Sequence, residues 1–487
     1  MNAPQLPFEL AQEYGIVVVA DEGASLFANT APHMTLATLA AARAQLGRPL
    51  RTQSVTADEF ALALRAAFSG SARIDAAKPS ESKRAAEIGA VSDDLLAQAE
   101  RDDAPAVRLL ADLLRNALAE RASDIHIDAT DQGARIRYRI DGVLRDVETI
   151  DSALHAALIA RCKVMATLDI AERRLPQDGR LQVTIAGRKV DVRVATLPTQ
   201  HGERAVLRLL DTAAAALDFS ALGMPQDIQE ALRSAVRMPN GLVLVTGPTG
   251  SGKTTTLYAA VSELDRARLN VVSVEDPVEY ALDRVAQTQV NPRIELTFAR
   301  ALRSILRHDP DVIIVGEIRD RETADIAVQA ALTGHLVIAS LHTNSAGAAV
   351  TRLMEMGVEP YLLASCLRGV LAQRLVRRLD ASKSARAAPS LAERKLLERY
   401  AIGDVTQLSA PSDAAGGDVE GYRGRFGLYR WLPVSNEIAK AIHARVADDA
   451  LEQIAVESGW SLMAANARQS LQSGDTSLAE VLRVVSA

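Results

Sequence analysis

Phosphate binding is the chemistry suggested by one short segment, Gly247-Pro248-Thr249-Gly250-Ser251-Gly252-Lys253-Thr254. It fits the pattern G-x-x-x-x-G-K-[ST], whose glycines let backbone N–H groups turn inward around phosphate oxygens. Lys253 can then reach the β- and γ-phosphates, and the Thr254 hydroxyl can hold Mg²⁺. An apolar run at 242–246 predicts a buried strand before the loop, and residues 255–264 predict a helix after it. The segment, extended to Thr255, therefore predicts an ATP-binding loop; a plain glycine-rich turn is the alternative.

Acidic residues follow two other apolar runs. Residues 312–315 lead through Gly316 to Glu317, and residues 271–274 lead to Glu275, Asp276 and Glu279. Crowded carboxylates repel one another unless a cation is near. We expect Glu317 to approach Mg²⁺ and to polarise the attacking water, as the acid beside a phosphate loop does. We expect Glu275 and Glu279 to lie near a bound Mg²⁺–ATP; a solvated strand end or an acidic surface turn is the alternative.

Two histidines, His335 and His342, bracket the apolar run at 336–341. In a strand, which rises about 3.3 Å per residue, they would lie more than about 20 Å apart, which argues against a shared zinc ion. We expect His342 to sense the γ-phosphate, with a structural, hydrogen-bonded histidine as the alternative.

The bulk properties restrict the class of protein. A chain of 487 residues with 48% apolar residues is expected to form two to four domains. A net charge of −6 gives no overall attraction to nucleic acid or anionic lipid. Cys162 and Cys366 fall in different expected domains, so we expect buried thiols in a reducing cytosol rather than a disulfide. Residues 1–15 lack the basic start of a signal peptide, and no apolar run approaches about 20 residues. These features predict a soluble, cytoplasmic protein that meets a membrane only through partners.

Composition divides the chain into successive segments. Residues 1–72 read as a small domain, 73–100 as a linker, and 101–215 as an α+β domain with strictly alternating strands. Residues 222–375 alternate strand and helix, which predicts a parallel sheet with helices on both faces. Residues 376–432 form a separate region, weakly patterned from 380 to 421, and 433–487 read as short helices. The predicted fold class is α/β.

The order of the motifs resembles that of the type II/type IV secretion ATPase superfamily. The loop, the segment 275–279, residues 307–320 and the segments 333–335 and 342–344 look like its Walker A, Asp box, Walker B and His box. Ser123-Asp124-Ile125-His126-Ile127, Arg139-Ile140-Asp141-Gly142, Leu175-Pro176-Gln177-Asp178-Gly179-Arg180 and Gly202-Glu203-Arg204 are similar to its second N-terminal domain. Gln373-Arg374-Leu375-Val376-Arg377 and Gly421-Tyr422-Arg423-Gly424-Arg425 match downstream motifs. Leu6-Pro7-Phe8 and Tyr14-Gly15-Ile16 resemble the start of the general secretory pathway (GspE) branch.

This resemblance implies a RecA-like P-loop ATPase domain, a homohexamer with ATP at subunit junctions, and a role in type II secretion through pseudopilus assembly. It implies that residues 1–72 dock on the cytoplasmic domain of an inner-membrane, GspL-like protein; a polytopic, GspF-like platform protein is a second candidate partner. Residues 210–219 would be the hinge. An arginine supplied to the γ-phosphate can raise the rate about 10³–10⁵-fold. The matching candidates are Arg193, Arg204, Arg208, Arg303 and Arg307.

One departure concerns zinc. Many members of the superfamily carry two CxxC pairs in the interval that corresponds to residues 380–420, which here contains neither Cys nor His. Since structural zinc sites use those side chains, we expect no zinc and a reorganised subdomain.

Other functions stay open at this point. A type IV pilus assembly ATPase would share the chemistry, and a regulatory nucleotide-binding module would lack turnover. A DNA-translocating RecA-like motor is disfavoured by the negative charge and by only 3% aromatic residues, because single-strand grooves need basic and stacking side chains. We therefore expect no nucleic-acid partner.

Overall fold

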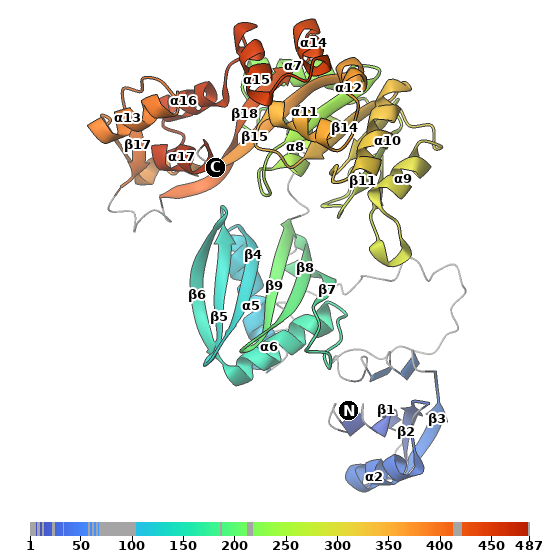
Figure 1. Cartoon of the computed structure of the whole chain (residues 1–487). Coiled ribbons are helices and arrows are strands. Elements are labelled where there is room, and N and C mark those ends of the chain that lie inside the picture. Colours follow the sequence, from blue (N-terminus) through green and yellow to red (C-terminus); the bar gives the residue numbers. More distant parts are fainter. Residues whose placement is uncertain are drawn as a thin grey trace.

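The computed structural model describes residues 6–67 with short gaps, and then 104–185, 188–211, 218–412 and 421–485. These residues form three successive bodies, with the largest at the top of Figure 1 and the N-terminal one at the bottom. The expected linker at 73–100 and residues 212–217 of the expected hinge lie outside the described residues. The predicted α/β fold class, with a small N-terminal body, an α+β body and a P-loop body, is confirmed.

The N-terminal body is a three-stranded sheet with a helix. Its sheet order is β1-β2-β3; β1 and β2 are antiparallel, and β2 and β3 are parallel. The elements are β1 (Ile16–Asp21), β2 (Leu26–Thr30), α2 (Leu36–Leu46) and β3 (Leu50–Ser54). A capping box between Thr35 and Thr38 begins α2, and Gly47 ends it in the left-handed region that favours glycine.

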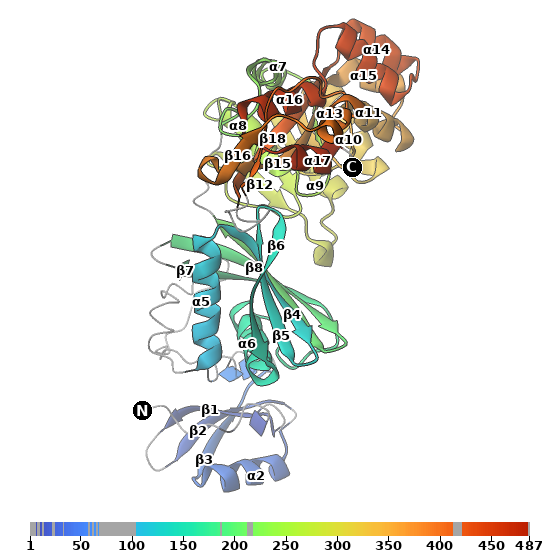
Figure 2. The same ribbon diagram turned by 90° about the vertical axis from the view of Figure 1, so that its left-hand side faces the viewer.

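The second body is a six-stranded antiparallel sheet in the order β6-β5-β4-β9-β8-β7. Two helices pack on one face through a common apolar core, as Figure 2 shows. Alternation along the strands turns most charged residues of β4, β5 and β9 to the other face, whereas Glu203 of β9 pairs with Lys163 of the second helix on the helix face. The elements are α5 (Pro105–Ala119), β4 (Ala122–Thr130), β5 (Gly133–Ile140), β6 (Val143–Asp151), α6 (Ser152–Met165), β7 (Gln177–Ile185), β8 (Arg188–Thr199) and β9 (Gly202–Asp211).

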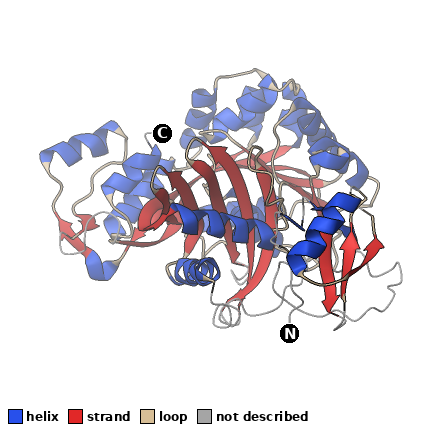
Figure 3. Cartoon of the chain, turned by 90° about the horizontal axis from the view of Figure 1, so that it is seen from below, coloured by secondary structure: helices blue, strands red, loops and turns tan. Residues whose placement is uncertain are grey.

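The third body is built on a seven-stranded sheet in the order β12-β11-β13-β14-β10-β15-β18. Figure 3 gives the strands of the chain in red and its helices in blue, seen from below. Its strands are β10 (Gly241–Thr246), β11 (Val271–Glu275), β12 (Val285–Gln289), β13 (Val312–Val315), β14 (Leu336–Leu341), β15 (Leu367–Leu379) and β18 (Tyr422–Pro433). All neighbouring pairs are parallel except β15 and β18. The sheet therefore continues beyond the expected boundary at 375, because β18 from the expected subdomain pairs along β15.

Helices cover both faces of this sheet, as predicted from the alternation of strand and helix. One face packs against α7 (Gln226–Val236) and α8 (Lys253–Ser262). The other packs against α9 (Phe298–Ile305), α10 (Arg321–Leu332), α11 (Ala346–Glu355), α12 (Pro360–Cys366), α14 (Asn436–His443) and α15 (Asp448–Glu457). The first two helices after residue 433 thus belong to the core of the third body. None of the helices described in the structure is both long and apolar enough to cross a bilayer.

The region that lacks Cys and His has a core of its own. It combines the antiparallel pair β16 (Ser384–Ala387) and β17 (Leu408–Pro411) with α13 (Leu391–Arg399), α16 (Met463–Ser473) and α17 (Leu478–Val485). A buried ion pair joins Arg377 to Glu480 at 2.9 Å, and the Arg377 guanidinium lies over the Tyr422 ring. Burial opposes ionisation, but hydrogen bonds from Arg483 and Arg377 lower the pKa of Glu480 to about 2.

We expect Glu480→Gln to lower the free energy of unfolding by about 3 kcal/mol at neutral pH, because Arg377 would lose its buried partner. The folded pKa of Glu480 lies below its ordinary 4.5, so the contribution is present above pH 4.5 and is lost as the pH falls toward 2. Urea unfolding at a series of pH values measures it. The matched control, Glu355→Gln, alters an exposed pair with Arg352 and should have little effect. Equal losses in both variants would contradict the assignment.

Candidate nucleotide site

The phosphate-binding segment connects the buried strand β10 to the helix α8. Gly247, Gly250 and Gly252 have φ values of 156°, 77° and 85°, in the region that favours glycine. A Cβ atom at Gly247 would lie 2.5 Å from both the Gln373 carbonyl oxygen and the Ser251 hydroxyl. Helix α8 begins at Lys253, two residues earlier than predicted. The free N–H groups of its first turn therefore stand at the end of the loop, where anions bind.

A polar side chain from the neighbouring strand β15 holds the loop in place. The buried amide of Gln373 donates from Nε2 to the Ser251 carbonyl oxygen at 2.6 Å. On the other side of β10, the hydroxyl groups of Thr246 and Thr343 lie 2.6 Å apart. The sequence motif contains Gln373, but sequence reasoning gave it no role. Its signal was an amide that lies, together with Arg374, inside the otherwise apolar run from 370 to 376, because a buried amide must be hydrogen-bonded.

Lys253, His342 and Glu317 form a continuous chain of contacts. Lys253 Nζ donates to the Gly247 carbonyl oxygen at 2.8 Å and lies 3.2 Å from His342 Nδ1. His342 Nε2 lies 2.9 Å from Glu317 Oε1. The three residues come from the loop and from the ends of β14 and β13, because the carboxyl ends of neighbouring parallel strands meet at one edge of a sheet. The structure thus brings the predicted lysine, carboxylate and histidine together.

Arg319 extends this chain to the Asp-box turn. Its Nη2 lies 2.8 Å from Glu317 Oε2, and its Nη1 lies 3.4 Å from Asp276 Oδ2. Sequence reasoning placed Arg319 inside the Walker B motif without assigning it a role. The available signal was its position two residues after Glu317, since an arginine so close to a functional carboxylate can pair with it.

Burial sets the charge state of the lysine. It lowers the pKa of Lys253 to about 8; the carboxylate of Glu317 opposes this shift, and Arg374 adds to it. Burial likewise lowers the pKa of Arg374, whose guanidinium donates to the Asn344 carbonyl oxygen at 2.7 Å. The site therefore holds several positive groups that are poorly solvated. A bound polyanion would offset the cost of burying their charge.

The two glutamates of the Asp box have different surroundings. Glu275 is buried; it accepts hydrogen bonds from Ser273 at 2.6 Å and from Gln287 at 3.0 Å, and also from Tyr258. Burial and this bond to Glu275 raise the pKa of Tyr258. Internal donors thus satisfy the Glu275 carboxylate in this structure, and its expected role beside a bound Mg²⁺–ATP stays a prediction. Glu279 instead faces the second body.

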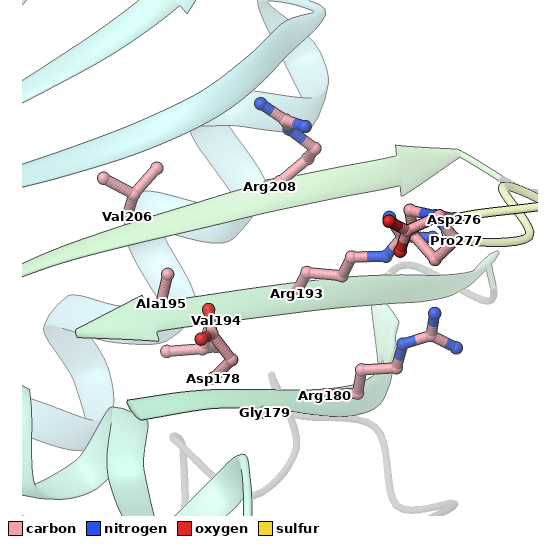
Figure 4. A pocket seen from close by; sticks show the side chains of 10 residues that line it. All are labelled: Asp178, Gly179, Arg180, Arg193, Val194, Ala195, Val206, Arg208, Asp276 and Pro277. Atoms are coloured by element: carbon pink, nitrogen blue, oxygen red, sulfur yellow. The ribbon is translucent and has the colours of Figure 1, made fainter. Parts of the chain in front are cut away.

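Arg193 reaches that turn from β8. Its Nη2 donates to the Val278 carbonyl oxygen at 2.7 Å and lies 3.5 Å from Glu279 Oε2. Figure 4 shows it pointing at Asp276 and Pro277. These residues line a cavity of about 500 Å³ between the two bodies, which Arg180 and Arg208 also line. Arg193 of the second body therefore reaches the Asp-box end of the nucleotide site.

The other candidate arginines make separate ion pairs or hydrogen bonds. Arg208 contacts Asp124 at 3.0 Å, and Arg204 contacts Asp128 at 2.7 Å, both within the second body. On α9, Arg303 pairs with Glu322, and Arg307 donates to the Arg303 carbonyl oxygen. Within one chain, these four arginines make no contact with Glu317. Their action across a subunit junction stays a prediction.

A glycine loop between a central parallel strand and a helix, with a lysine and a strand-end carboxylate linked through a histidine, defines a P-loop nucleotide-binding protein. The model of the type II/IV secretion system protein family matches residues 99–483, and a model for one domain of GSPII protein E matches residues 5–68. This chain belongs to the type II/IV secretion system protein family.

Its relatives cover nearly the whole chain. It is 47% identical to the type II secretion system protein HxcR of Pseudomonas aeruginosa, over 90% of each chain. It is 47% identical to the type II secretion system ATPase E of Vibrio cholerae, over 82% of this chain and 81% of the other. Among solved structures, it is similar to the pilus retraction motor PilT with bound ADP, at 25% identity and a TM-score of 0.53, over 77% of this chain and 96% of that one. The ATPase DotB of Legionella pneumophila, at 22% identity and a TM-score of 0.58 over 78% and 96%, shares the fold.

Proposed function

We propose that this protein hydrolyses ATP to power type II secretion, as a homohexamer in the cytoplasm at the inner membrane. The observation that carries the proposal is the chain from Lys253 through His342 to Glu317, which joins the phosphate loop to a carboxylate at the end of the neighbouring strands. The family membership and relatives named type II secretion system ATPase E support it.

The residues of the site divide the work of phosphoryl transfer. The loop amides and Lys253 bind the β- and γ-phosphates. The Glu317 carboxylate orients and polarises the attacking water, while His342 registers whether the γ-phosphate is present through its contacts with Lys253 and Glu317. The hydroxyl of Thr254 and the Glu317 carboxylate are oxygen donors of the kind Mg²⁺ prefers, and Mg²⁺ would neutralise charge on the phosphate oxygens.

Positive charge on the departing phosphate would come from arginines. Arg193 is best placed, since it already contacts the Asp-box turn within one chain. Arg204, Arg208, Arg303 and Arg307 would act across subunit junctions in the hexamer. Mass photometry with and without ATP tests the assembly: a particle of six chains supports it, and a monomer at every nucleotide concentration contradicts it.

The N-terminal body is the proposed link to the membrane. Its match to a domain of GSPII protein E supports docking on the cytoplasmic domain of an inner-membrane, GspL-like protein, with a GspF-like platform protein as the second candidate. The deciding experiment measures phosphate release by the full chain with and without that cytoplasmic domain. Stimulation supports secretion; stimulation only by the corresponding pilus protein would favour a type IV pilus assembly ATPase.

We expect nucleotide binding to take up protons near pH 8. Lys253 has a pKa of about 8 in the free protein, and a bound triphosphate would raise that pKa again. Uptake should therefore be about half a proton per ATP at pH 8 and near zero at pH 6.5. Calorimetry in buffers of different ionisation enthalpy measures it. Lys253→Arg, which stays charged at both pH values, should remove the effect; equal uptake in that variant would contradict the assignment to Lys253.

A further inference from the structure

Two motifs that have no role in the nucleotide site meet in space. The Asp141 carboxylate accepts a hydrogen bond from the Gly424 backbone N–H at 2.8 Å, although the two residues are 283 positions apart. Arg425 Nε lies 3.5 Å from the other carboxylate oxygen. The Asp141 side chain is only 17% exposed. This contact attaches the second body to strand β18 of the third.

Both sides of the contact are short, well-defined turns. Asp141 and Gly142, with φ values of 50° and 87°, form the two-residue loop between β5 and β6, where Ile140 pairs with Val143. Such loops need positive φ at both positions. Arg139 Nη1 donates to the Gly142 carbonyl oxygen at 3.0 Å and holds the turn. Gly424 also has a positive φ, 81°. The carboxylate and its donor are therefore presented by backbone with little freedom.

The contact is connected to the phosphate loop by a pair of strands. β18 runs antiparallel to β15, with Arg425 opposite Arg377 and Tyr429 opposite Gln373. Gln373 is the residue that supports Ser251 in the loop. Asp141 thus holds the second body to the same strand pair that positions the phosphate-binding segment.

The second body has another attachment at the opposite side of the sheet. Arg193 contacts Val278 and Glu279 after β11, next to the edge strand β12, whereas Asp141 contacts the other edge strand, β18. Only the Arg193 side adjoins the chain of contacts that ends at Glu317, through Asp276 and Arg319. A change at the γ-phosphate therefore has a direct route to the Arg193 attachment.

We propose that the contact of Asp141 with Gly424 and Arg425 is a fixed pivot, on which the second body turns while its Arg193 attachment changes with the bound nucleotide. Asp141 is then a positioning residue for hydrolysis, because it keeps Arg193 within reach of the Asp-box turn. The motion rests on the proposed ATPase function. The pivot itself is a property of the protein without nucleotide.

Distances between spin labels in the full chain test the pivot. Both native cysteines are buried, so labels can be placed on cysteines introduced at exposed positions. One pair, Glu148 on β6 and Leu391 on α13, reports the pivot side; the other, Gln182 on β7 and Asp283 before β12, reports the Arg193 side. Labelled protein is diluted with unlabelled protein, so that distances within one chain dominate.

In the unsubstituted protein, we expect the first distance to stay the same with ADP and with a non-hydrolysable ATP analogue, and the second to shift. Asp141→Gly keeps the turn but removes the carboxylate. In the protein without nucleotide, this variant should lower the ratio of molecules with an attached second body to molecules with a detached one at least about tenfold. The distribution of the first distance should broaden accordingly. Asp141→Asn keeps an acceptor and should restore the narrow distance. A first distance that shifts as much as the second, or stays narrow in Asp141→Gly, would overturn the proposal.

Turnover adds a second measurement, because a positioning role should change kcat without changing the KM for ATP, whereas a merely structural role should not separate the two constants. Asp141→Gly should lower kcat while leaving the KM for ATP nearly unchanged, since the phosphate loop is intact, and Asp141→Asn should recover most of the loss. A higher KM for ATP at an unchanged kcat would contradict the assignment of Asp141 as a positioning residue. If the unsubstituted protein hydrolysed no ATP, the proposed function would fail, yet the label distances without nucleotide would still decide whether Asp141 holds the second body.

Discussion

Lys253→Ala is expected to lower ATP turnover at least about 100-fold, because it removes the one side-chain cation that the phosphate loop itself supplies. In the structure, the amine donates hydrogen bonds to the carbonyl oxygens of Gly247 and Pro248. Phosphate oxygens would replace those acceptors. Steady-state phosphate release at saturating Mg²⁺–ATP measures the loss, and binding of a fluorescent ATP analogue should weaken with it.

A matched lysine separates this effect from general damage. Lys395 is exposed on α13, far along the chain from the loop, and Lys395→Ala should leave turnover unchanged. Far-ultraviolet circular dichroism should show both variants folded. Turnover near the normal rate in folded Lys253→Ala would show that phosphate is bound elsewhere.

The centre of the site follows from local sequence. The loop and His342 lie directly after an apolar run and Glu317 lies two residues after one, and the ends of parallel strands gather at one edge of a sheet. Residues that share this rule can be placed together from the sequence alone. The same rule fixes the order strand, loop, helix around Lys253. Within that order, α8 begins and ends two residues earlier than predicted, at Lys253 and Ser262.

Contacts between distant segments carry no such local rule. Gln373 reaches the loop from 122 residues away, and the partner of Asp141 is 283 residues away. The pairing of β18 with β15 depends on how the chain returns after residue 379, so composition placed a boundary at 375 where the sheet continues. Glu275 shows a further limit of prediction from sequence. A glutamate at this position indicated a nearby nucleotide site, but the donors that surround its carboxylate come from side chains of α8 and β12.

That difference between two glutamates leads to the sharpest test of the chemistry. Glu317→Gln should keep ATP binding but lower kcat by about 10²–10³-fold, because the amide cannot take a proton from water or polarise it as a carboxylate does. The amide can still accept from Arg319 or His342, so the fold around it should persist. Single-turnover hydrolysis, measured beside equilibrium binding, separates the two effects.

Glu275→Gln is the matched comparison, since it makes the same chemical change one strand away. Its carboxylate accepts hydrogen bonds from Ser273, Gln287 and Tyr258 inside the core, and an amide cannot accept all of them. We expect a lower melting temperature and a smaller fall in kcat than in Glu317→Gln. If Glu275→Gln instead lost turnover at unchanged stability while Glu317→Gln remained active, the roles assigned to the two glutamates would have to be exchanged.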